Sequence, residues 1–340
     1  MINTEMHLRD DLFEAKEQAP TRDGFGKGLI EAAAADPRVV VLCADLTEST
    51  RVEGFKKQFP DRFIEVGVAE QNLAALASGF AAAGKIPFIT SYATFNPGRN
   101  NEQIRTTISL NRVPVKIAGC HAGVSVGPDG ATHQALEDIA LMRVQPHMTV
   151  ISPCDAEEAR KATLAAARHD TPVYLRFGRE KTPLMTTSET PFEIGKANVV
   201  WEDRSFTGRS DLATRSAVIF ATGPLLYNAL FAARELETQG IRVSVVNIHT
   251  IKPLDQETII REAKNAGAVV TVEEHQVAGG LGSAIAEVLA QECPVPIEFI
   301  GVHDQFGQSG TPSELIEHYH MGVTSIKEAI VRCASRKNAA

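Results

Sequence analysis

The chain has 340 residues, 44% of them hydrophobic, and a formal net charge of −8. A single hydrophobic core usually stops growing at roughly 250 residues, so this length predicts two domains. Acidic and basic residues are spread along the chain, which argues against a nucleic-acid-binding surface. Five widely spaced cysteines, an N-terminus without a signal-peptide pattern and no apolar run near the ~18 residues of a membrane span predict a reduced cytoplasmic protein outside the membrane.

The first half of the chain alternates short apolar runs with amphipathic stretches. Residues 1–20 are polar and are expected to form an N-terminal arm or a short helix. Continuous apolar runs are typical of strands buried on both faces of a parallel sheet. Between residues 21 and 185 they predict strands within 38–46, 63–68, 87–91, 113–120, 148–155 and 172–180, with helices at 23–35, 72–83, 136–144 and 155–169.

Residues 186–212 lose this alternation. They are polar and contain Pro191, Gly195 and Gly208, so they are expected to link two domains. A second alternating set fills residues 213–340, with strands at 217–222, 241–248, 268–274 and 296–302 and helices near 225–239, 255–266, 282–291 and 324–335. The pattern predicts an α/β protein of two doubly wound domains with mostly parallel sheets, the second domain being smaller.

A carboxylate and two aromatic residues mark a candidate ligand crevice. Glu70 follows the strand at 63–68, and Tyr92 and Phe95 follow the strand at 87–91. In an open α/β sheet, ligands bind beyond the carboxyl ends of the strands. Glu70 also lies next to the start of the predicted helix at 72–83, where the helix dipole favours a carboxylate without any further role. Its position alone therefore leaves both interpretations open.

A glycine-punctuated loop follows the strand at 113–120. It begins at His121, ends at His133 and carries Asp129 between glycines that allow a close approach of the backbone. Loops at the carboxyl ends of strands commonly carry binding residues. Histidine changes its charge near neutral pH, which suits acid–base chemistry. The loop is a candidate for a catalytic or binding site.

Several separated motifs, in the same order, resemble the transketolase family. They are CADLTEST, VGVAEQN, the Tyr92–Phe95 pair followed by GRNNEQIR, and CHAGVSVGPDGATHQALED. The resemblance runs from about Thr21 to the C-terminus. It implies a pyrimidine-binding domain at residues 21–185 and a transketolase C-terminal domain at residues 213–340.

The resemblance implies thiamine diphosphate as the cofactor. Glu70 matches the carboxyl group that activates the pyrimidine through its N1′ atom, and an apolar setting would favour the protonated form that this role needs. Phe95, with Tyr92 behind it, would supply an aromatic wall for the pyrimidine. His133 and, more loosely, Asp45 match further cofactor-facing positions.

The resemblance also implies transfer of a two-carbon unit from a ketose phosphate to an aldose phosphate. His121 and His133 match the acid–base positions near the sugar hydroxyls. The implied substrate-binding positions also include Asp129 for the donor hydroxyl, with Arg22, Ser49 and Arg179 for the sugar phosphate.

One motif of the family is absent from the sequence. Transketolases bind the diphosphate through Mg²⁺ (or Ca²⁺) held by a Gly-Asp-Gly motif, and this chain contains none. The metal is therefore expected on another polypeptide, an N-terminal-type subunit, with the cofactor at the interface. The chain is predicted to be the C-terminal subunit of a split transketolase, inactive alone. Because family members dimerise, an α₂β₂ assembly is expected.

Three other interpretations remain open at this point. Deoxyxylulose-phosphate synthases share the Ala-Glu-Gln segment, but Arg is usual at the position of His121 and their loop is shorter. Pyruvate dehydrogenase β subunits also lack the metal motif, but they do not show the two-histidine loop. A non-catalytic subunit is the third, and the presence of Glu70, Asp129 and both histidines argues against it. The sequence does not identify the physiological sugars.

Overall fold

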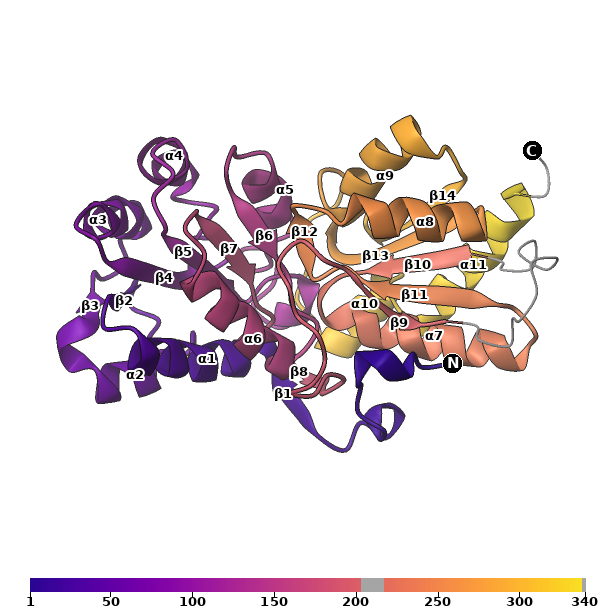
Figure 1. Ribbon diagram of the computed structural model, residues 1–340, viewed down its shortest axis with the longest axis horizontal. Helices are drawn as coiled ribbons and strands as arrows, with labels where there is room; N and C mark the ends of the chain where they lie inside the picture. The colour runs from indigo at the N-terminus through magenta and orange to yellow at the C-terminus, as the bar shows by residue number, and fades with distance from the viewer. Residues whose placement is uncertain (203–216, 338–340) are drawn as a thin grey trace.

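Two α/β domains lie next to each other along the longest axis of the molecule (Figure 1). The computed structural model describes residues 1–202 and 217–337. It confirms the predicted fold class, because a seven-stranded sheet forms the first domain and a five-stranded sheet forms the second.

The first sheet has the strand order β12-β6-β7-β5-β4-β2-β3. Every neighbouring pair in it is parallel except β12 with β6. Its strands are β2 (Val39–Cys43), β3 (Phe63–Glu65), β4 (Ile86–Tyr92), β5 (Lys116–Cys120), β6 (Thr149–Ile151), β7 (Val173–Arg176) and β12 (Thr250–Lys252). β2 and β5, each with a strand on both sides, are buried at every residue, as their apolar runs predict.

Helices cover both faces of this sheet (Figure 1). On one face lie α1 (Thr21–Ala35), α2 (Glu53–Gln58) and α6 (Ala156–Ala167); on the other lie α3 (Glu70–Ala82), α4 (Asn101–Gln103), the π-helical η4 (Ile104–Ser109) and α5 (Asp138–Arg143). α1 packs closely on α6 because Gly24 has no side chain. A Cβ atom at Gly24 would lie only 1.8 Å from the carbonyl oxygen of Ala156.

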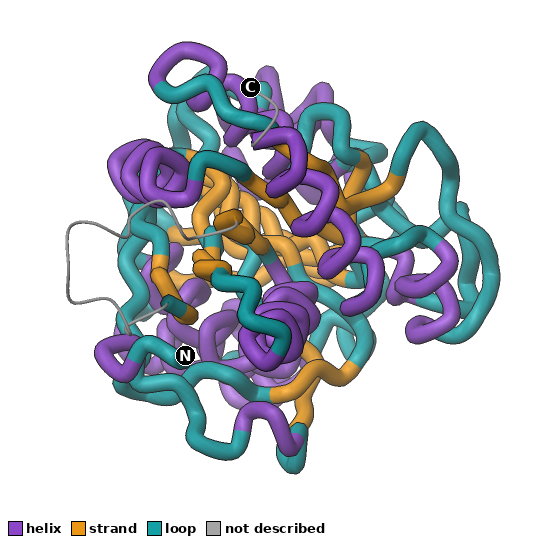
Figure 2. Tube along the Cα trace, turned by 90° about the vertical axis from the view of Figure 1, so that its right-hand side faces the viewer, coloured by secondary structure: helices purple, strands orange, loops and turns teal. Residues whose placement is uncertain are grey.

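The second sheet has the order β14-β13-β10-β11-β9 and is parallel except at β9. Its strands are β9 (Asn198–Trp201), β10 (Ala217–Ala221), β11 (Val243–Asn247), β13 (Val269–Gln276) and β14 (Ile297–Val302). The helices are α7 (Leu226–Thr238), α8 (Gln256–Ala266), α9 (Leu281–Glu292), α10 (Pro312–His318) and α11 (Val323–Lys337). Figure 2 shows this sheet end-on, with helices on both sides of the strands.

The N-terminal arm lies against the second domain. It contains the short 3₁₀ helices η1 (Thr4–Met6) and η2 (Leu12–Glu14), followed by β1 (Gln18–Pro20), which pairs with β8 (Lys181–Pro183). Leu8 and Leu12 are buried in the second domain's core. The polar arm expected from the sequence therefore connects the two domains.

Besides the short β1–β8 pair, β9 and β12 lie outside the strand positions predicted from the sequence. β9 falls inside residues 186–212, which were expected to be an irregular link, and it pairs with β11. β12 follows the first strands of the second domain, but it joins the first sheet beside β6. Both runs are too short to show a period, so only their pairing identifies them. Residues 203–212 of the expected link, with Gly208, and the first residues of the second set, 213–216, lie outside the described residues.

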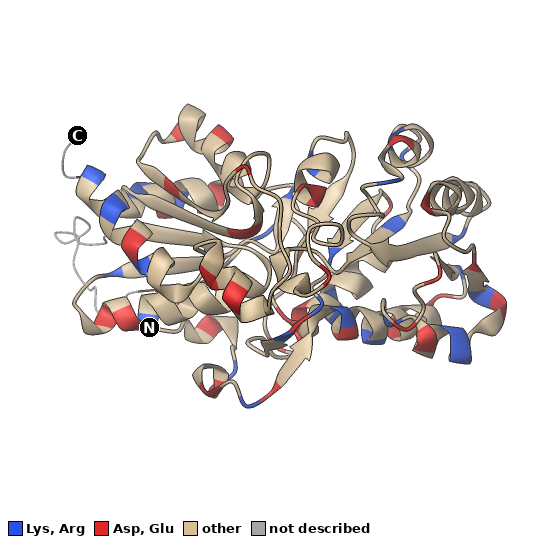
Figure 3. Ribbon diagram, turned by 180° about the vertical axis from the view of Figure 1, so that it is seen from behind, with Lys and Arg blue, Asp and Glu red and all other residues tan. Residues whose placement is uncertain are grey.

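Charged residues of both signs are interspersed over both domains (Figure 3). Across residues 1–202 and 217–337, no helix has the length and apolar character needed to span a bilayer.

Candidate active site

Several predicted site residues follow the carboxyl ends of neighbouring strands in the first sheet. Asp45 follows β2, Tyr92 ends β4 and His121 follows β5. Asp45 and His121 both have left-handed backbones, with φ of 58° and 57°. Such conformations are uncommon for residues other than glycine and occur often at functional sites.

Two aromatic rings and two imidazoles form one wall. The ring centroids of Tyr92 and His121 lie 3.9 Å apart, and those of Tyr92 and Phe95 lie 6.2 Å apart in a stacked arrangement. His133 meets Phe95 edge-on at 5.5 Å and Tyr92 at 6.0 Å. The β4 end and the His121–His133 loop therefore meet in one cluster, although they are separate in the sequence.

Glu70 is the first residue of α3 and only 2% exposed. Its carboxylate accepts hydrogen bonds from Nη1 of Arg99 at 2.8 Å and from the Ser91 hydroxyl at 3.3 Å. The guanidinium of Arg99 also lies over the Phe95 ring, 4.7 Å from its centroid. The apolar setting expected around Glu70 is not found, since a cation touches the carboxylate and the neighbouring Val68 is 71% exposed.

Arg99 is not among the predicted site residues, although it belongs to the GRNNEQIR motif. Arg99 lies four residues after Phe95, and its backbone N–H donates to the carbonyl oxygen of Phe95. This four-residue spacing places the guanidinium above the ring, and it is the sequence feature that could have identified Arg99.

A second basic group lies against His121. Nη1 of Arg22, at the start of α1, is 3.0 Å from Nε2 of His121 and donates to the carbonyl oxygen of Ser49 at 2.8 Å. His121 is 2% exposed. Burial, with the positive charges of Arg22 and Arg179, lowers the pKa of His121 to about 3. The imidazole is therefore neutral near pH 7, and it accepts from Arg22 at Nε2.

Two buried donors in this pair have no partner in the described part of the chain. They are Nδ1 of His121 and Nε of Arg22. Buried polar groups are nearly always hydrogen-bonded, so unpaired donors beside a cation favour a ligand with acceptor oxygens. An anionic group such as a phosphate fits this position.

Of the remaining predicted residues, His133 and Asp129 lie on the His121–His133 loop, and Arg179, which follows β7, contacts this loop. The Thr132 hydroxyl bonds Nδ1 of His133 at 2.9 Å, and Nη1 of Arg179 donates to the carbonyl oxygen of Val126 at 2.6 Å. Asp129 is exposed on the loop. Arg99 thus joins Glu70 and Phe95 by direct contacts. Arg22 in turn contacts Ser49 and His121. Asp45 and Asp129 lie on exposed edges.

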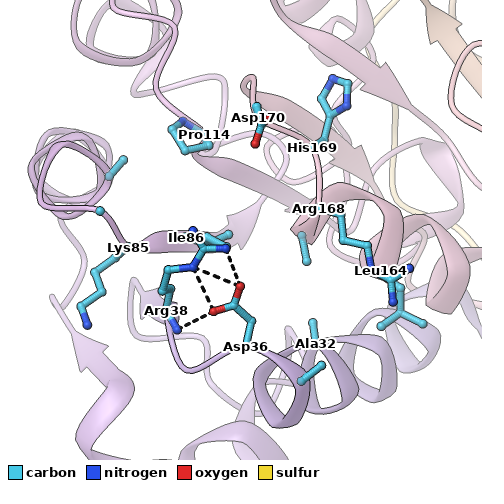
Figure 4. A pocket seen from close by; sticks show the side chains of 14 residues that line it. Ala32, Asp36, Arg38, Lys85, Ile86, Pro114, Leu164, Arg168, His169 and Asp170 are labelled. Carbon is cyan, nitrogen blue, oxygen red and sulfur yellow. Dashed lines mark hydrogen bonds and ion pairs between the residues drawn. The ribbon is translucent and has the colours of Figure 1, made fainter.

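Within residues 1–202 and 217–337, no group of three or more His, Cys, Asp or Glu side chains is placed to hold a metal ion. A separate cavity of about 350 Å³ opens at the opposite edge of the first sheet, near the start of β4 (Figure 4). Its lining includes the Asp36–Arg38 ion pair, Lys85 and His169. None of the predicted site residues belongs to that lining.

Comparisons with known proteins identify the family. The transketolase pyrimidine-binding domain family matches residues 17–185, and the transketolase C-terminal domain family matches residues 209–326. The chain therefore belongs to the transketolase family.

Its similarity to C-terminal sections of split transketolases extends over nearly the whole length. The chain is 39% identical to the 6-deoxy-6-sulfo-D-fructose transketolase subunit SqwH of Clostridium sp. (strain MSTE9), covering 96% of this chain and 98% of that subunit. It is 41% identical to a putative transketolase C-terminal section of Methanocaldococcus jannaschii, covering 91% and 95%. A solved structure described as a split gene transketolase, inactive β4 tetramer, matches with a TM-score of 0.85 and 42% identity over 94% of this chain and 99% of that one.

Proposed function

We propose that this chain is the C-terminal subunit of a two-chain transketolase. In this role it transfers a two-carbon ketol unit from a ketose to an aldose, with thiamine diphosphate as the cofactor. One observation carries the proposal: Glu70, the Tyr92–Phe95 aromatic pair, both loop histidines and Arg22 meet at one edge of the first sheet.

The residues present fit an aminopyrimidine ring. Phe95 offers a flat aromatic face. The buried carboxyl group of Glu70 lies nearby, since Arg99 contacts both the Phe95 ring and the Glu70 carboxylate. When bound, thiamine diphosphate would supply the carbon nucleophile that carries the two-carbon unit. Glu70 would then share a proton with the pyrimidine ring nitrogen, which requires Arg99 to leave the carboxylate.

The histidines would exchange protons with sugar hydroxyls. His121 is neutral near pH 7 because its pKa is about 3, so it can accept a proton. An anion bound at Arg22 would offset the cations that lower this pKa, which makes the protonated imidazole easier to form. His133 lies across the aromatic wall from His121, close to the proposed pyrimidine position.

The unpaired donors of Arg22 and His121 support a substrate with a terminal anionic group. A sugar phosphate fits, and so does a sugar sulfonate, because both present several acceptor oxygens. The name of the Clostridium relative refers to a 6-deoxy-6-sulfo sugar. We therefore assign Arg22, Ser49 and Arg179 to the terminal anion and Asp129 to a donor hydroxyl.

The proposal requires a second polypeptide. The chain contains no Gly-Asp-Gly motif, and its described residues include no cluster suited to a metal. We propose that an N-terminal transketolase subunit carries this motif, binds Mg²⁺ or Ca²⁺ and the diphosphate, and assembles with this chain as α₂β₂. Aspartate oxygens are the ligands that these hard cations prefer.

Co-expression with such a subunit tests the function. Two-carbon transfer is measured from xylulose 5-phosphate, fructose 6-phosphate and 6-deoxy-6-sulfofructose to ribose 5-phosphate and glyceraldehyde 3-phosphate, with thiamine diphosphate and Mg²⁺. Glu70→Gln keeps the size of the side chain but removes the shared proton, so transfer is expected to fall by at least about 100-fold, the scale of acid–base catalysis.

Glu158→Gln is the matched control. Glu158 is also a buried glutamate, 2% exposed, but its carboxylate accepts the backbone N–H of Cys154 and Nδ2 of Asn247, a β11 residue of the second domain, each at 2.7 Å. Burial raises its pKa to about 7, and the amide keeps one of the two acceptor oxygens, so the Glu158→Gln complex is expected to retain transfer. Equal activities of the Glu70→Gln and wild-type complexes would exclude Glu70 as the activating group. Cofactor binding without transfer from any donor would exclude these substrates.

A further inference from the structure

The side chain of Gln134 holds the His121–His133 loop from inside. It directly follows His133 and is 4% exposed. The two N–H groups of its amide Nε2 are shared among three carbonyl oxygens: Val124 at 3.0 Å, Gly127 at 3.2 Å and Gln308 at 3.0 Å. Two of these acceptors lie on the loop, and the third belongs to the C-terminal domain. A single amide therefore ties the catalytic loop to the other domain.

The segment that contains Gln308, residues 303–311, lies directly under the loop and is here called the brace. Two loop glycines face it with positive φ, Gly127 at +83° and Gly130 at +73°. A Cβ atom on Gly127 would lie 3.3 Å from the carbonyl oxygen of Gly310, and one on Gly130 would lie 2.7 Å from Oγ of Ser309. The loop thus rests on the brace without room for side chains between them.

Other residues of the C-terminal domain hold the first half of the brace. The backbone N–H of Asp304 donates to Oε1 of Gln276 at 3.0 Å, and Nε2 of Gln276 donates to the carbonyl oxygen of Gln305 at 2.6 Å. The hydroxyl of Tyr319 donates to the carbonyl oxygen of Phe306 at 2.9 Å. The brace is therefore a support anchored to β13 and to the end of α10.

Two further contacts join the loop near Ser125 and the residue Ala135 to the same domain. The carboxylate of Glu274 in β13 accepts the backbone N–H of Ser125 at 2.6 Å. Nη2 of Arg176 bridges the carbonyl oxygens of Glu274 and Ala135, at 2.9 and 3.3 Å. These contacts hold the loop near Ser125 and just after it at Ala135. Gln134 provides the contact with the second domain that lies next to His133.

We infer that Gln134 is a positioning residue for His133 and that the C-terminal domain takes part in the reaction through the brace. The inference rests on the proposed function, in which His133 exchanges protons with the sugar. A proton-transfer group must lie within hydrogen-bond reach of its target, and misplacement by about 1 Å lowers the rate by about 100-fold. The amide of Gln134 keeps the backbone of His133 at a fixed distance from Phe95 and Tyr92.

Gln134→Met tests this role, because methionine fills a similar volume without donors. In the two-chain complex, kcat is expected to fall by about 10- to 100-fold with little change in the KM of the cofactor. In the free chain, hydrogen exchange of the backbone amides in residues 123–133 is expected to rise at least 10-fold. The imidazole NMR signal of His133 is expected to broaden or shift, while that of His249 stays in place.

Two further variants make the test specific. Gln145→Met is the matched control, since Gln145 is 6% exposed near the end of α5, away from the loop. Gln276→Met removes two hydrogen bonds to the brace and leaves the loop unchanged. It should raise hydrogen exchange in residues 123–133 by a smaller factor than Gln134→Met does. It also replaces the first variant as the test if Gln134→Met does not fold.

Unchanged exchange and an unchanged His133 signal in Gln134→Met would overturn the positioning role. An equal rise of exchange throughout the chain would overturn it too, because it would show a general loss of stability. If the wild-type complex shows no sugar transfer, the proposed function fails, and the exchange and NMR results on the free chain still decide whether Gln134 and the brace hold His133.

Discussion

The Glu70–Arg99 ion pair makes a quantitative prediction about cofactor binding. Arg99 occupies both groups that we assign to the pyrimidine: the Glu70 carboxylate, at 2.8 Å, and the face of Phe95, at 4.7 Å. The guanidinium must leave both before the cofactor can use them. Replacing Arg99 with methionine removes this competition, so the cofactor is expected to bind more tightly.

The size of the effect follows from the exposure of the pair. A hydrogen bond to a charged group contributes about 1.5–3 kcal/mol, whereas an exposed ion pair contributes about 0–1 kcal/mol. The Arg99 side chain is 47% exposed and that of Glu70 is 2% exposed, so we take about 1 kcal/mol for the pair. The contact with Phe95 adds about 0.5–1 kcal/mol. At 1.4 kcal/mol per factor of ten, affinity should rise roughly 10- to 30-fold.

Isothermal titration of thiamine diphosphate into the two-chain complex, in the presence of Mg²⁺, measures this change. Arg105→Met is the control, because Arg105 is an exposed arginine of the adjoining η4. In the free chain, Arg99→Met should also lower thermal stability, since it leaves the Glu70 carboxylate buried without its cation. Equal or weaker cofactor affinity in Arg99→Met would refute the reasoning and would show that Arg99 itself helps to bind the cofactor.

Two further predictions concern histidines. In Arg22→Met the pKa of His121 should rise above about 3 but stay below its ordinary value, because burial remains the larger cause; an NMR titration of the free chain that shows no rise would contradict the assigned role of Arg22. His249 is buried and its pKa is lowered to about 3, so the unfolded chain binds the extra proton and stability falls as the pH drops below about 6.5. Replacing His249 with phenylalanine should remove about 1.4 kcal/mol per pH unit of that slope, measured by urea unfolding near pH 4, 5 and 6, and parallel slopes in the two proteins would contradict it.

Much of the fold could be predicted because its signals are local. The apolar run at 39–43 is buried at every residue, and α6 begins after Asp155, whose side chain caps the helix by accepting the N–H of Glu158. The same holds for part of the site. Tyr92 and His121 come at the ends of strands, and parallel strands bring their carboxyl ends to one edge of a sheet.

The contacts within the site depended on the tertiary structure. Arg22 and His121 are 99 residues apart in the chain, so their contact, and the low pKa that it helps to cause, have no local signature. The pairing of Arg99 with Glu70 replaced the apolar setting expected there.

The sequence by itself determined the alternation of elements, the two domains and the set of chemical groups at the strand ends. Periodicity reports which residues are buried, and spacing reports which ones cap a helix or end a strand. Neither reports which distant segments pack together. The addition of β12 to the first sheet and the support of the loop by Gln308 arise when the two domains dock, and only the tertiary structure could decide them.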